Sequence, residues 1–462
     1  MGVNKVSVPK GTRDFAPLEM SRRGYIFSTI KRIFGIYGYQ PLETPSMENL
    51  STLLGKYGEE GDKLLFRILN SGDFLRGLPV GDLSDIRGMS PEKLAPMLCD
   101  KGLRYDLTVP FARFVSQNWH ELPKPFKRYQ IQPVWRADRP QKGRYREFYQ
   151  CDIDVVGSNS QLCEVELVQV VEDVFGELGL KVELRFNNRK ALAAMAEAIG
   201  HEELLIPITV AIDKYDKIGL EGVKEELASA GVSPEGVAKI SAIVQADGSN
   251  EERLQALAEA IGDNPKGQEG MAEIRELLAL VEQVGVKIPV ILDLSLARGL
   301  NYYTGAIFEV KTLDCKIGSV CGGGRYDNLT GIFGLKDVSG VGISFGADRI
   351  YDAMLELSLF PEDVETSLDV LILNLGEEEV RAGMAVAVDI RRKGLRVMVF
   401  PDGVKFKKQM DYANRQKATW VVIIGSDEMA RGEAGVKNMH TGEQSSMPMG
   451  SIAQWLQEQT HK

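Results

Sequence analysis

The sequence of 462 residues lacks the features that mark membrane, secreted and metal-rich proteins. No apolar run approaches the roughly 18–20 residues that cross a bilayer, and residues 1–15 contain no apolar segment typical of a secretory signal. The five cysteines form no C-x-x-C pair, and the four histidines form no H-E-x-x-H pattern. We therefore expect a cytoplasmic protein without disulfides or a structural metal site.

The common phosphate-binding motif G-x-x-x-x-G-K-[ST] is also absent. The glycine cluster at residues 321–325, Cys-Gly-Gly-Gly-Arg, resembles a phosphate cradle. The same cluster is equally typical of a tight turn or of closely packed backbone. Both interpretations stay open on these residues alone.

Charge is unevenly distributed along the chain. The net charge of −10 argues against a nucleic-acid partner, yet residues 124–146 contain eight lysines and arginines and one acidic residue. Residues 369–462 carry a net charge of +1, whereas residues 1–368 carry −11. A charge run is most often a solvated surface, so the basic segment indicates a nucleic-acid site only together with other features.

Apolar spacing predicts an α+β core with an antiparallel sheet. Helices are expected over residues 18–37 and 161–178, an extended segment over 39–45, and a hairpin of strands over 126–135 and 146–155. Residues 72–96, which are rich in glycine and proline, are expected to form a loop or short helices.

The domain organisation follows from changes in composition. Residues 188–287 are rich in Ala, Glu and Leu at helical spacing, which predicts a helical insertion. After a linker at 360–367, strands over 369–374, 396–400 and 420–424 alternate with helices over 377–392 and 406–415. This alternation predicts a small α/β domain with a largely parallel sheet. The expected division is a core of residues 1–187 and 288–360, the insertion at 188–287, and a C-terminal domain at 368–462.

Three arginines stand in settings that suggest phosphate chemistry. Arg136 ends a predicted strand, Arg298 lies in an apolar segment, and Arg349 begins a helix after a glycine-bounded strand. The guanidinium fork fits phosphate oxygens, although any one of the three could make a structural ion pair instead. Without an evident catalytic His or Cys, the set favours phosphoryl or nucleotidyl transfer, which depends on positioning and charge stabilisation.

At these residues the sequence resembles the histidyl-tRNA synthetases, a class II aminoacyl-tRNA synthetase family, over essentially the whole chain. The segments that carry the resemblance are Val-Pro-Lys-Gly-Thr-Arg-Asp-Phe at 8–15, Leu-Arg-Tyr-Asp-Leu-Thr-Val-Pro at 103–110, Gly-Arg-Tyr-Arg-Glu-Phe-Tyr-Gln-Cys-Asp at 143–152, Leu-Ala-Arg-Gly-Leu-Asn-Tyr-Tyr at 296–303, Gly-Gly-Gly-Arg-Tyr-Asp at 322–327 and Gly-Ile-Ser-Phe-Gly-Ala-Asp-Arg at 342–349. The resemblance implies histidine–tRNA ligase activity: ATP converts L-histidine to histidyl-adenylate, and the histidyl group passes to the 3′ end of tRNA(His).

The resemblance also implies an ATP site. Arg136 would grip the α-phosphate and the amino-acid carboxylate, Arg349 would hold the γ-phosphate of a bent ATP, and Phe148 would stack on the adenine against Arg349. Asp138 replaces a family glutamate that faces the adenine amine, and Arg144 belongs to the same site. Mg²⁺ is expected on the β- and γ-phosphates.

The histidine site implied by the resemblance has three parts. Asp106, Thr108 and Gln150 would bind the α-amino group. Asp154 and Tyr303 would bind the two imidazole nitrogens, with Tyr302 and Tyr326 lining the pocket. Arg298, together with Arg136, would touch the α-phosphate and the attacking carboxylate as a catalytic residue. Gln150 and Asp154 alternate along one predicted strand and therefore share a face.

The implied partners are tRNA and a second copy of the chain. Gln141 and Arg146, in the basic hairpin loop, would meet the acceptor end of the tRNA, and the C-terminal domain would read the anticodon. The helix over 18–37 and the strand that ends at Pro45 would build a homodimer interface. The alternatives are a non-catalytic relative, either a regulatory subunit of histidine biosynthesis or a tRNA-sensing module, and a class II synthetase for another amino acid.

Overall fold

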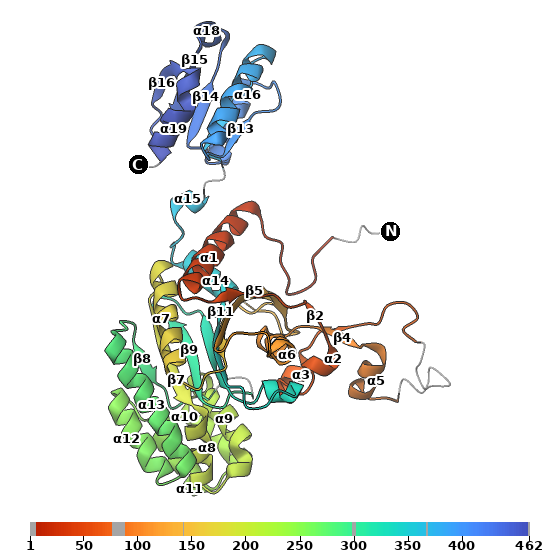
Figure 1. Ribbon diagram of the computed structural model, residues 1–462, viewed down its shortest axis with the longest axis vertical. Helices are drawn as coiled ribbons and strands as arrows, with labels where there is room; N and C mark the ends of the chain where they lie inside the picture. Colours follow the sequence, from red (N-terminus) through yellow and green to blue (C-terminus); the bar gives the residue numbers. More distant parts are fainter. Residues whose placement is uncertain (1–5, 76–87, 142, 298–301, 366–367, 461–462) are drawn as a thin grey trace. The chain divides into compact units, whose positions relative to one another are not determined.

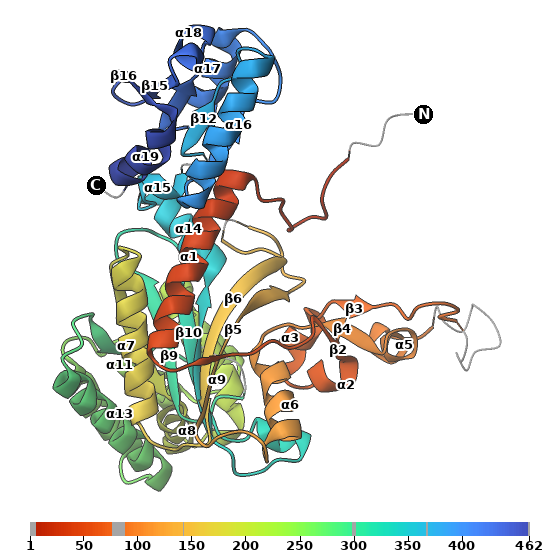
Figure 2. The same cartoon turned by 45° about the horizontal axis from the view of Figure 1, so that its top comes forward.

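The structure is a computed structural model that describes residues 6–75, 88–141, 143–297, 302–365 and 368–460. The chain forms two compact units. Unit 1 contains residues 1–14 and 26–359, and unit 2 contains residues 15–25 and 360–462. Figures 1 and 2 show the elements of each unit. Within the described ranges, no helix has both the length and the apolarity needed to cross a membrane.

Unit 1 is built on an eight-stranded sheet. In spatial order its strands are β1 (Gln40–Pro41), β5 (Phe126–Trp135), β6 (Glu147–Val156), β11 (Gly340–Gly346), β10 (Cys321–Tyr326), β9 (Ala306–Thr312), β7 (Val182–Asn188) and β8 (Val290–Leu292). Only the outermost pairs, β1 with β5 and β7 with β8, are parallel among these strands. The predicted antiparallel core and its β5–β6 hairpin are therefore confirmed.

Helices α1 (Pro17–Ile36), α7 (Leu162–Glu177) and α14 (Ala347–Glu356) follow the predicted helical segments. Part of α1 and the whole of α7 lie against one face of the sheet (Figure 2). Phe345 of β11 packs there between Phe34 of α1 and Phe175 of α7, with ring centroids 5.6 Å apart in both pairs. Because side chains alternate along a strand, the residues next to Phe345 face the other side of the sheet.

A smaller subdomain borders that other side of the sheet. Its strands β2 (Met47–Asn49), β4 (Lys101–Leu103) and β3 (Arg67–Ile68) form a three-stranded sheet, accompanied by α2 (Leu50–Leu53), α3 (Gly58–Lys63), α5 (Pro91–Leu98) and α6 (Thr108–Asn118). Tyr57, Tyr105 and Phe111 belong to the apolar cluster that holds it to the main sheet. Within the segment expected to be a loop or short helices, α5 begins at Pro91, and residues 76–87 lie outside the described ranges.

Between β7 and β8 the chain is helical. The helices are α8 (Arg189–Ala198), η1 (Glu202–Leu204), α9 (Leu205–Asp213), α10 (Tyr215–Ser229), α11 (Pro234–Val244), α12 (Asn250–Ile261) and α13 (Pro265–Val284). Several start with a polar cap: Ser249 accepts from the Glu252 amide, and the Glu252 carboxylate accepts from the Ser249 amide. Such a capping box satisfies two backbone donors at the helix start. The segment belongs to the same compact unit as the sheet.

Unit 2 contains a five-stranded sheet in the order β13 (Val397–Val399), β12 (Val370–Ile372), β14 (Trp420–Ile423), β15 (Glu433–Asn438) and β16 (Gln444–Pro448). Its helices include α16 (Glu377–Arg392), α17 (Phe406–Arg415), α18 (Ser426–Ala430) and α19 (Ile452–Thr460), and α15 (Glu362–Glu365) precedes the sheet. Separate apolar clusters lie within residues 368–456.

The predicted α/β pattern of unit 2 holds through β14, but its sheet is mixed rather than largely parallel. β12 pairs in parallel with β13 and β14, whereas β15 pairs antiparallel with β14 and β16. The reason is connection length: only the short α18 separates β14 from β15, and parallel neighbours need a crossover of about a dozen residues or more.

Candidate active site

A row of polar residues crosses the open face of the main sheet. In the β5–β6 ladder, Arg128 lies opposite Asp154, and Gln130 lies opposite Asp152. On the other side of β6, Gly342 lies opposite Asp154 and Ser344 lies opposite Asp152 in β11. The alternation puts the polar set on one face and Cys151, Ile153 and Val155 on the helix-covered face. Strands β5, β6 and β11 thus form a polar surface of Arg128, Gln130, Asp152, Asp154 and Ser344, which we call the polar floor.

Asp154 is held at two points on this floor. Its Oδ2 lies 2.7 Å from Nη2 of Arg128, and its Oδ1 accepts a hydrogen bond of 2.7 Å from the Tyr326 hydroxyl. Burial raises the pKa of Asp154, which the Arg128 charge and the Tyr326 bond oppose. Each carboxylate oxygen keeps a further lone pair for a ligand.

Asp106 forms a second buried anchor, between β4 and α6. Its Oδ1 accepts from the Tyr57 hydroxyl at 3.0 Å and from the Val109 amide at 3.1 Å, and its Oδ2 accepts from the Tyr302 hydroxyl at 3.2 Å. Burial raises the pKa of Asp106, whereas these bonds act in the opposite direction. Thr108 is hydrogen-bonded to the Tyr302 hydroxyl. The structure therefore brings together Asp106, Thr108 and Tyr302, three of the residues that the resemblance places in the histidine site.

Three tyrosines close the space above the floor. The Tyr302 ring lies edge-on to Tyr303 at 4.9 Å and to Tyr326 at 6.1 Å between centroids. Burial raises the pKa of each of the three hydroxyls, so they stay protonated and can donate hydrogen bonds at neutral pH. The Tyr303 hydroxyl can therefore donate a hydrogen bond into the cavity that the Asp154 carboxylate, an acceptor, also lines.

The cavity between floor and tyrosines is lined by Thr108, Asp152, Asp154, Tyr303, Gly322, Tyr326, Gly342, Ile343 and Ser344. Its volume is about 10 Å³, room for roughly one water molecule. An imidazole ring can enter only if lining side chains move apart. Glycine preserves even this space, because a Cβ at Gly342 would collide with the Asp154 carboxylate and one at Gly340 would collide with the Tyr326 ring.

The glycine cluster at residues 321–325 lies in strand β10, which pairs with β11 along residues 321–326 and with β9 along residues 321–324. A Cβ at Gly324 would come within 2.9 Å of the Tyr303 ring. The interpretation as closely packed backbone is confirmed. The interpretation as a phosphate cradle is wrong, because these residues pair with neighbouring strands of the sheet.

Gln150 lies at the edge of the same floor. Its Nε2 donates to the Ser344 hydroxyl at 2.7 Å, whereas its buried Oε1 has no hydrogen-bond partner among the described residues. An unpartnered buried acceptor is costly. The site thus has an acceptor ready for a ligand donor at the position predicted to bind the α-amino group.

Arg136 follows β5 directly and approaches the site from the hairpin end. Its Nε donates to the Tyr105 carbonyl at 3.1 Å, and its guanidinium lies 4.3 Å from the Tyr105 ring centroid and 5.2 Å from that of Phe148. Arg136 also acts electrostatically on Asp106. Arg136 and Phe148 are therefore neighbours, and Arg136 lies near Asp106.

The hairpin loop is held by its own side chains. Arg144 Nη2 bonds to Asp138 Oδ1 at 2.8 Å, and Arg146 Nε donates to the Asp138 carbonyl at 3.0 Å. Gln141 forms a β-bridge with Arg144. Arg146 also contacts the N-terminal segment, since its amide donates to the Gly11 carbonyl at 2.8 Å. The predicted ATP and acceptor-end residues of this loop thus form one connected group.

Arg349, in the first turn of α14, reaches the same loop. Its Nε donates to the Gly143 carbonyl at 3.1 Å and its Nη1 to the Ser319 carbonyl at 2.6 Å. The neighbouring Asp348 pairs with Arg13 and accepts from the Tyr149 amide at 2.9 Å. Arg298, the remaining predicted site residue, lies outside the described residues.

Four residues of the site were missed by the sequence analysis: Arg128, Asp152, Ser344 and Tyr57. Arg128 and Asp152 carried a signal, because both are charged residues at alternating positions of the predicted hairpin strands. The sequence carried no such signal for Ser344 or Tyr57. Ser344 reaches the site through the pairing of β11 with β6, and Tyr57 reaches it through the packing of the segment at α3.

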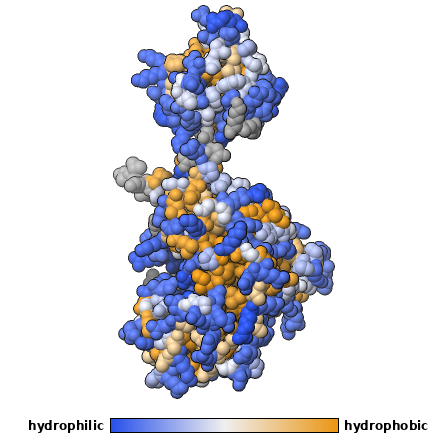
Figure 3. All heavy atoms as spheres, turned by 90° about the vertical axis from the view of Figure 1, so that its left-hand side faces the viewer, coloured by the Kyte–Doolittle hydropathy of each residue, from blue (hydrophilic) through white to orange (hydrophobic). Residues whose placement is uncertain are grey.

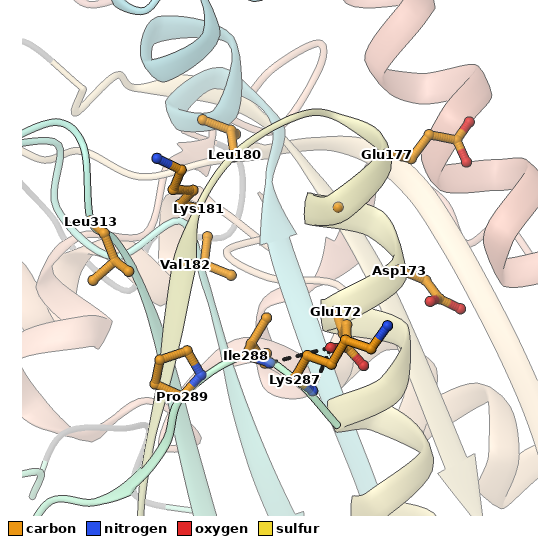
Figure 4. A pocket seen from close by; sticks show the side chains of 11 residues that line it. Glu172, Asp173, Glu177, Leu180, Lys181, Val182, Lys287, Ile288, Pro289 and Leu313 are labelled. Carbon is orange, nitrogen blue, oxygen red and sulfur yellow. Dashed lines mark hydrogen bonds between the residues drawn. The ribbon is translucent and has the colours of Figure 1, made fainter. Parts of the chain in front are cut away.

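A second, larger hollow of about 630 Å³ contains none of the predicted site residues. It lies between α7 and the edge of the sheet, where Glu172 accepts from the amides of Lys287 and Ile288 at 2.6 and 3.2 Å (Figure 4). One face of unit 1 shows apolar side chains gathered near its middle (Figure 3). This hollow lacks the buried, convergent polar groups of the small cavity.

Comparisons with known proteins point to one family. The family model for histidyl-tRNA synthetase matches residues 100–350, and that for the anticodon binding domain matches residues 369–459. The histidine–tRNA ligase of Phocaeicola vulgatus is 56% identical over 441 residues, covering 96% of each chain. That of Porphyromonas gingivalis is 51% identical over 446 residues, covering 96% of this chain and 98% of its own.

A solved structure shows the same fold over the full length. The histidyl-tRNA synthetase of a Nostoc species superimposes with a TM-score of 0.81 at 29% identity, covering 99% of this chain and 100% of that one. The matched segments include the polar floor, the tyrosine cluster and the C-terminal sheet. The chain therefore belongs to the histidyl-tRNA synthetase family.

Proposed function

We propose that this protein is a histidine–tRNA ligase, which activates L-histidine with ATP and transfers it to tRNA(His). The observation that carries the proposal is the cavity in which Asp154, fixed by Arg128 and Tyr326, faces the same space as Tyr303. Neutral imidazole donates from one ring nitrogen and accepts at the other. A carboxylate acceptor and a hydroxyl donor on one cavity match that pattern.

The α-amino group would lie between Asp106, Thr108 and Gln150. Asp106 is buried and oriented by Tyr57 and the Val109 amide, and Gln150 Oε1 is an acceptor without a partner among the described residues. An ammonium group has three donors and no acceptor. It therefore suits a site made of oxygen acceptors.

In the first reaction a histidine carboxylate oxygen attacks the α-phosphorus of ATP. The new P–O bond gives histidyl-adenylate, and the bond to the β-phosphate oxygen breaks to release pyrophosphate. In the second, the terminal tRNA hydroxyl attacks the acyl carbon and AMP leaves. Arg136 and Arg298 would stabilise the charge on the α-phosphate oxygens, a contribution of typically about 10²–10³ in rate for one preorganised donor.

ATP would lie along the hairpin, with its adenine between Phe148 and Arg349 and with Asp138 and Arg144 beside it. The Asp138–Arg144 pair and the reach of Arg349 to Gly143 support this placement. The described residues include no group of three His, Cys, Asp or Glu side chains that could hold a metal. Mg²⁺ would be held chiefly by the phosphates of ATP and would neutralise phosphate charge there.

The tRNA would meet both units. Gln141 and Arg146, on the basic hairpin loop, would contact the acceptor end. Residues 368–462 would read the anticodon, in keeping with the family model that matches 369–459. We retain residues 1–187 and 288–360 as the catalytic core and 188–287 as the insertion domain.

A homodimer in the cytoplasm completes the proposal. The edge strand β1 pairs on one side with β5, and Ile36 at the end of α1 is 68% exposed, which supports an interface there. All five cysteines, which lie in described segments, are free thiols, in keeping with a reducing compartment.

The alternative of a regulatory relative has weaker support. A Bacillus halodurans protein described as an ATP phosphoribosyltransferase regulatory subunit/histidyl-tRNA synthetase superimposes with a TM-score of 0.71 at 19% identity, which shows the fold alone. Relatives at 51–56% identity are named histidine–tRNA ligases.

The test is pyrophosphate exchange with each amino acid in turn. We expect exchange with histidine only, and aminoacylation of tRNA(His). Asp154→Asn should lower kcat/KM for histidine by about 10²–10⁴, because an amide mismatches a buried hydrogen bond, while KM for ATP changes little. No exchange with histidine, or equal exchange with another amino acid, would refute the assignment.

A further inference from the structure

Asp152 occupies the middle of the polar floor. It lies between Gln150 and Asp154 on β6, on the same face of the strand, and is 1% exposed. It lines the cavity together with Thr108 and Tyr303. A carboxyl group so placed needs a partner, since an isolated buried charge is among the costliest features of a fold.

Ser344 connects Asp152 to Gln150. The Ser344 hydroxyl accepts from Gln150 Nε2 at 2.7 Å and is hydrogen-bonded to the Asp152 carboxyl. A hydroxyl has a single proton to donate, so that proton goes to Asp152 while the oxygen receives Gln150. The Gln150 amide is thereby turned with its NH₂ group toward Ser344, which leaves Oε1 as the free end.

Two acceptors of this group are left without a partner among the described residues. They are Oε1 of Gln150 and Oδ1 of Asp152, both buried. The other two carboxyls of the pocket differ from Asp152. Asp154 accepts from Tyr326 at Oδ1, and its Oδ2, which makes no hydrogen bond to a described residue, has the charge of Arg128 Nη2 at 2.7 Å. Asp106 accepts from two tyrosines and a backbone amide. A cationic hydrogen-bond donor is therefore expected next to Gln150 Oε1 and Asp152 Oδ1, which lie on the same face of β6.

We propose that Asp152 is a further histidine-binding residue, whose Oδ1 accepts a hydrogen bond from the substrate α-ammonium group beside Oε1 of Gln150. This inference rests on the proposed function. The α-ammonium group has three donors and a full charge, so it can serve Asp152, Gln150 and Asp106 together. The imidazole stays with Asp154 and Tyr303, where Asp154 lies two residues further along β6.

Burial also raises the pKa of Asp152, to about 7. The charged groups that act on it are Arg128, which lowers the pKa, and Asp154 and Asp106, which raise it; the Ser344 bond lowers it. An arriving ammonium group would favour the ionised form of Asp152, so histidine binding would release a proton from the empty pocket.

The test compares ligands with and without the amino group. The full-length protein is titrated with histidine, with histidinol, which keeps the ammonium group, and with 3-(imidazol-4-yl)propionate, which lacks it. Asp152→Asn keeps the shape and an acceptor for Ser344 but removes the charge. We expect affinity for histidine and histidinol to fall about 10- to 100-fold, with affinity for the propionate within threefold of wild type.

Asp154→Asn serves as the matched control, because it should weaken all three ligands by acting on the imidazole. Ser344→Ala provides a second test at a partly exposed position: it frees the Gln150 amide and should weaken only the two ligands with an ammonium group. An Asp152→Asn loss below threefold for histidine, or an equal loss for the propionate, overturns the inference. Histidine-dependent pyrophosphate exchange by the wild type separates that outcome from failure of the proposed function.

Discussion

Arg128 lies directly opposite Asp154 in the β5–β6 ladder, and its Nη2 is 2.7 Å from the Asp154 carboxylate. Both side chains are buried, and the guanidinium also lies 4.2 Å from the centroid of the Phe111 ring. The pair keeps a charged acceptor at the bottom of a nearly closed pocket. In the proposed histidine site, selectivity for an imidazole would therefore depend on Arg128, a residue that does not itself need to touch the substrate.

The first prediction concerns this pair. Arg128→Met should lower the free energy of unfolding by about 3–5 kcal/mol, because it leaves the Asp154 charge buried and uncompensated. Adding Asp154→Asn should restore part of that loss, since the double variant buries no charge. Urea denaturation at neutral pH of both single variants and the double variant measures the coupling. Additive losses in the two single variants would show that the ion pair is not coupled.

The second prediction concerns the glycine beside Asp154. In Gly342→Ala the new Cβ would collide with the Asp154 carboxylate and lie 2.6 Å from the Ile153 carbonyl, so Asp154 must turn away. We expect KM for histidine to rise at least tenfold, with KM for ATP within threefold of wild type. Gly176→Ala is the control, because Gly176 lies in α7 with no atom near its Cβ position and alanine favours a helix there. Equal effects of the two substitutions would remove Gly342 from the pocket wall.

The sequence predicted the elements of this site better than their contacts. Alternation along residues 146–155 placed Gln150 and Asp154 on one face, because strand periodicity is local. Ser344 could not be placed, since its position opposite Asp152 depends on the pairing of β11 with β6, far apart in the chain. The glycine cluster at 321–325 was ambiguous for the same reason: only the flanking strands decide whether its amides are free.

The same distinction holds for unit 2. Helices 377–392 and 406–415 were predicted to the residue, because their apolar stripes are local. The antiparallel pairing of β15 and β16 was not predicted, since it depends on the short connection after β14 rather than on a pattern within either strand.

The third prediction concerns removal of residues 369–462. The apolar clusters of that segment lie within residues 368–456, so their loss leaves the core of unit 1 intact. Histidine-dependent pyrophosphate exchange should persist, whereas aminoacylation of tRNA(His) should fall, because the proposed anticodon contacts would be lost. Rates of both reactions with the truncated and full-length proteins provide the measurement. Equal charging of tRNA by the two proteins would contradict the role assigned to unit 2.

The last prediction is the pH dependence that Asp152 gives to stability. Its pKa is about 7 in the fold and 3.8 as the ordinary value. Between these values the native state holds a proton that the unfolded chain has lost, so unfolding releases a proton and wild-type stability falls as pH rises. Below about pH 4 both states are protonated, and above about pH 7 both are ionised, so the slope from this group vanishes outside the window.

Asp152→Asn has no such titration. Relative to wild type it should therefore gain stability from pH 4.5 to pH 8, by an amount on the order of 2–4 kcal/mol, since each pKa unit corresponds to about 1.36 kcal/mol. Urea denaturation of the histidine-free protein at several pH values measures the difference. Asp73→Asn, which changes a solvent-exposed carboxyl, is the control and should run parallel to wild type. A constant difference between Asp152→Asn and wild type over this range would show that Asp152 is ionised throughout, and that a cation already serves it in the empty pocket.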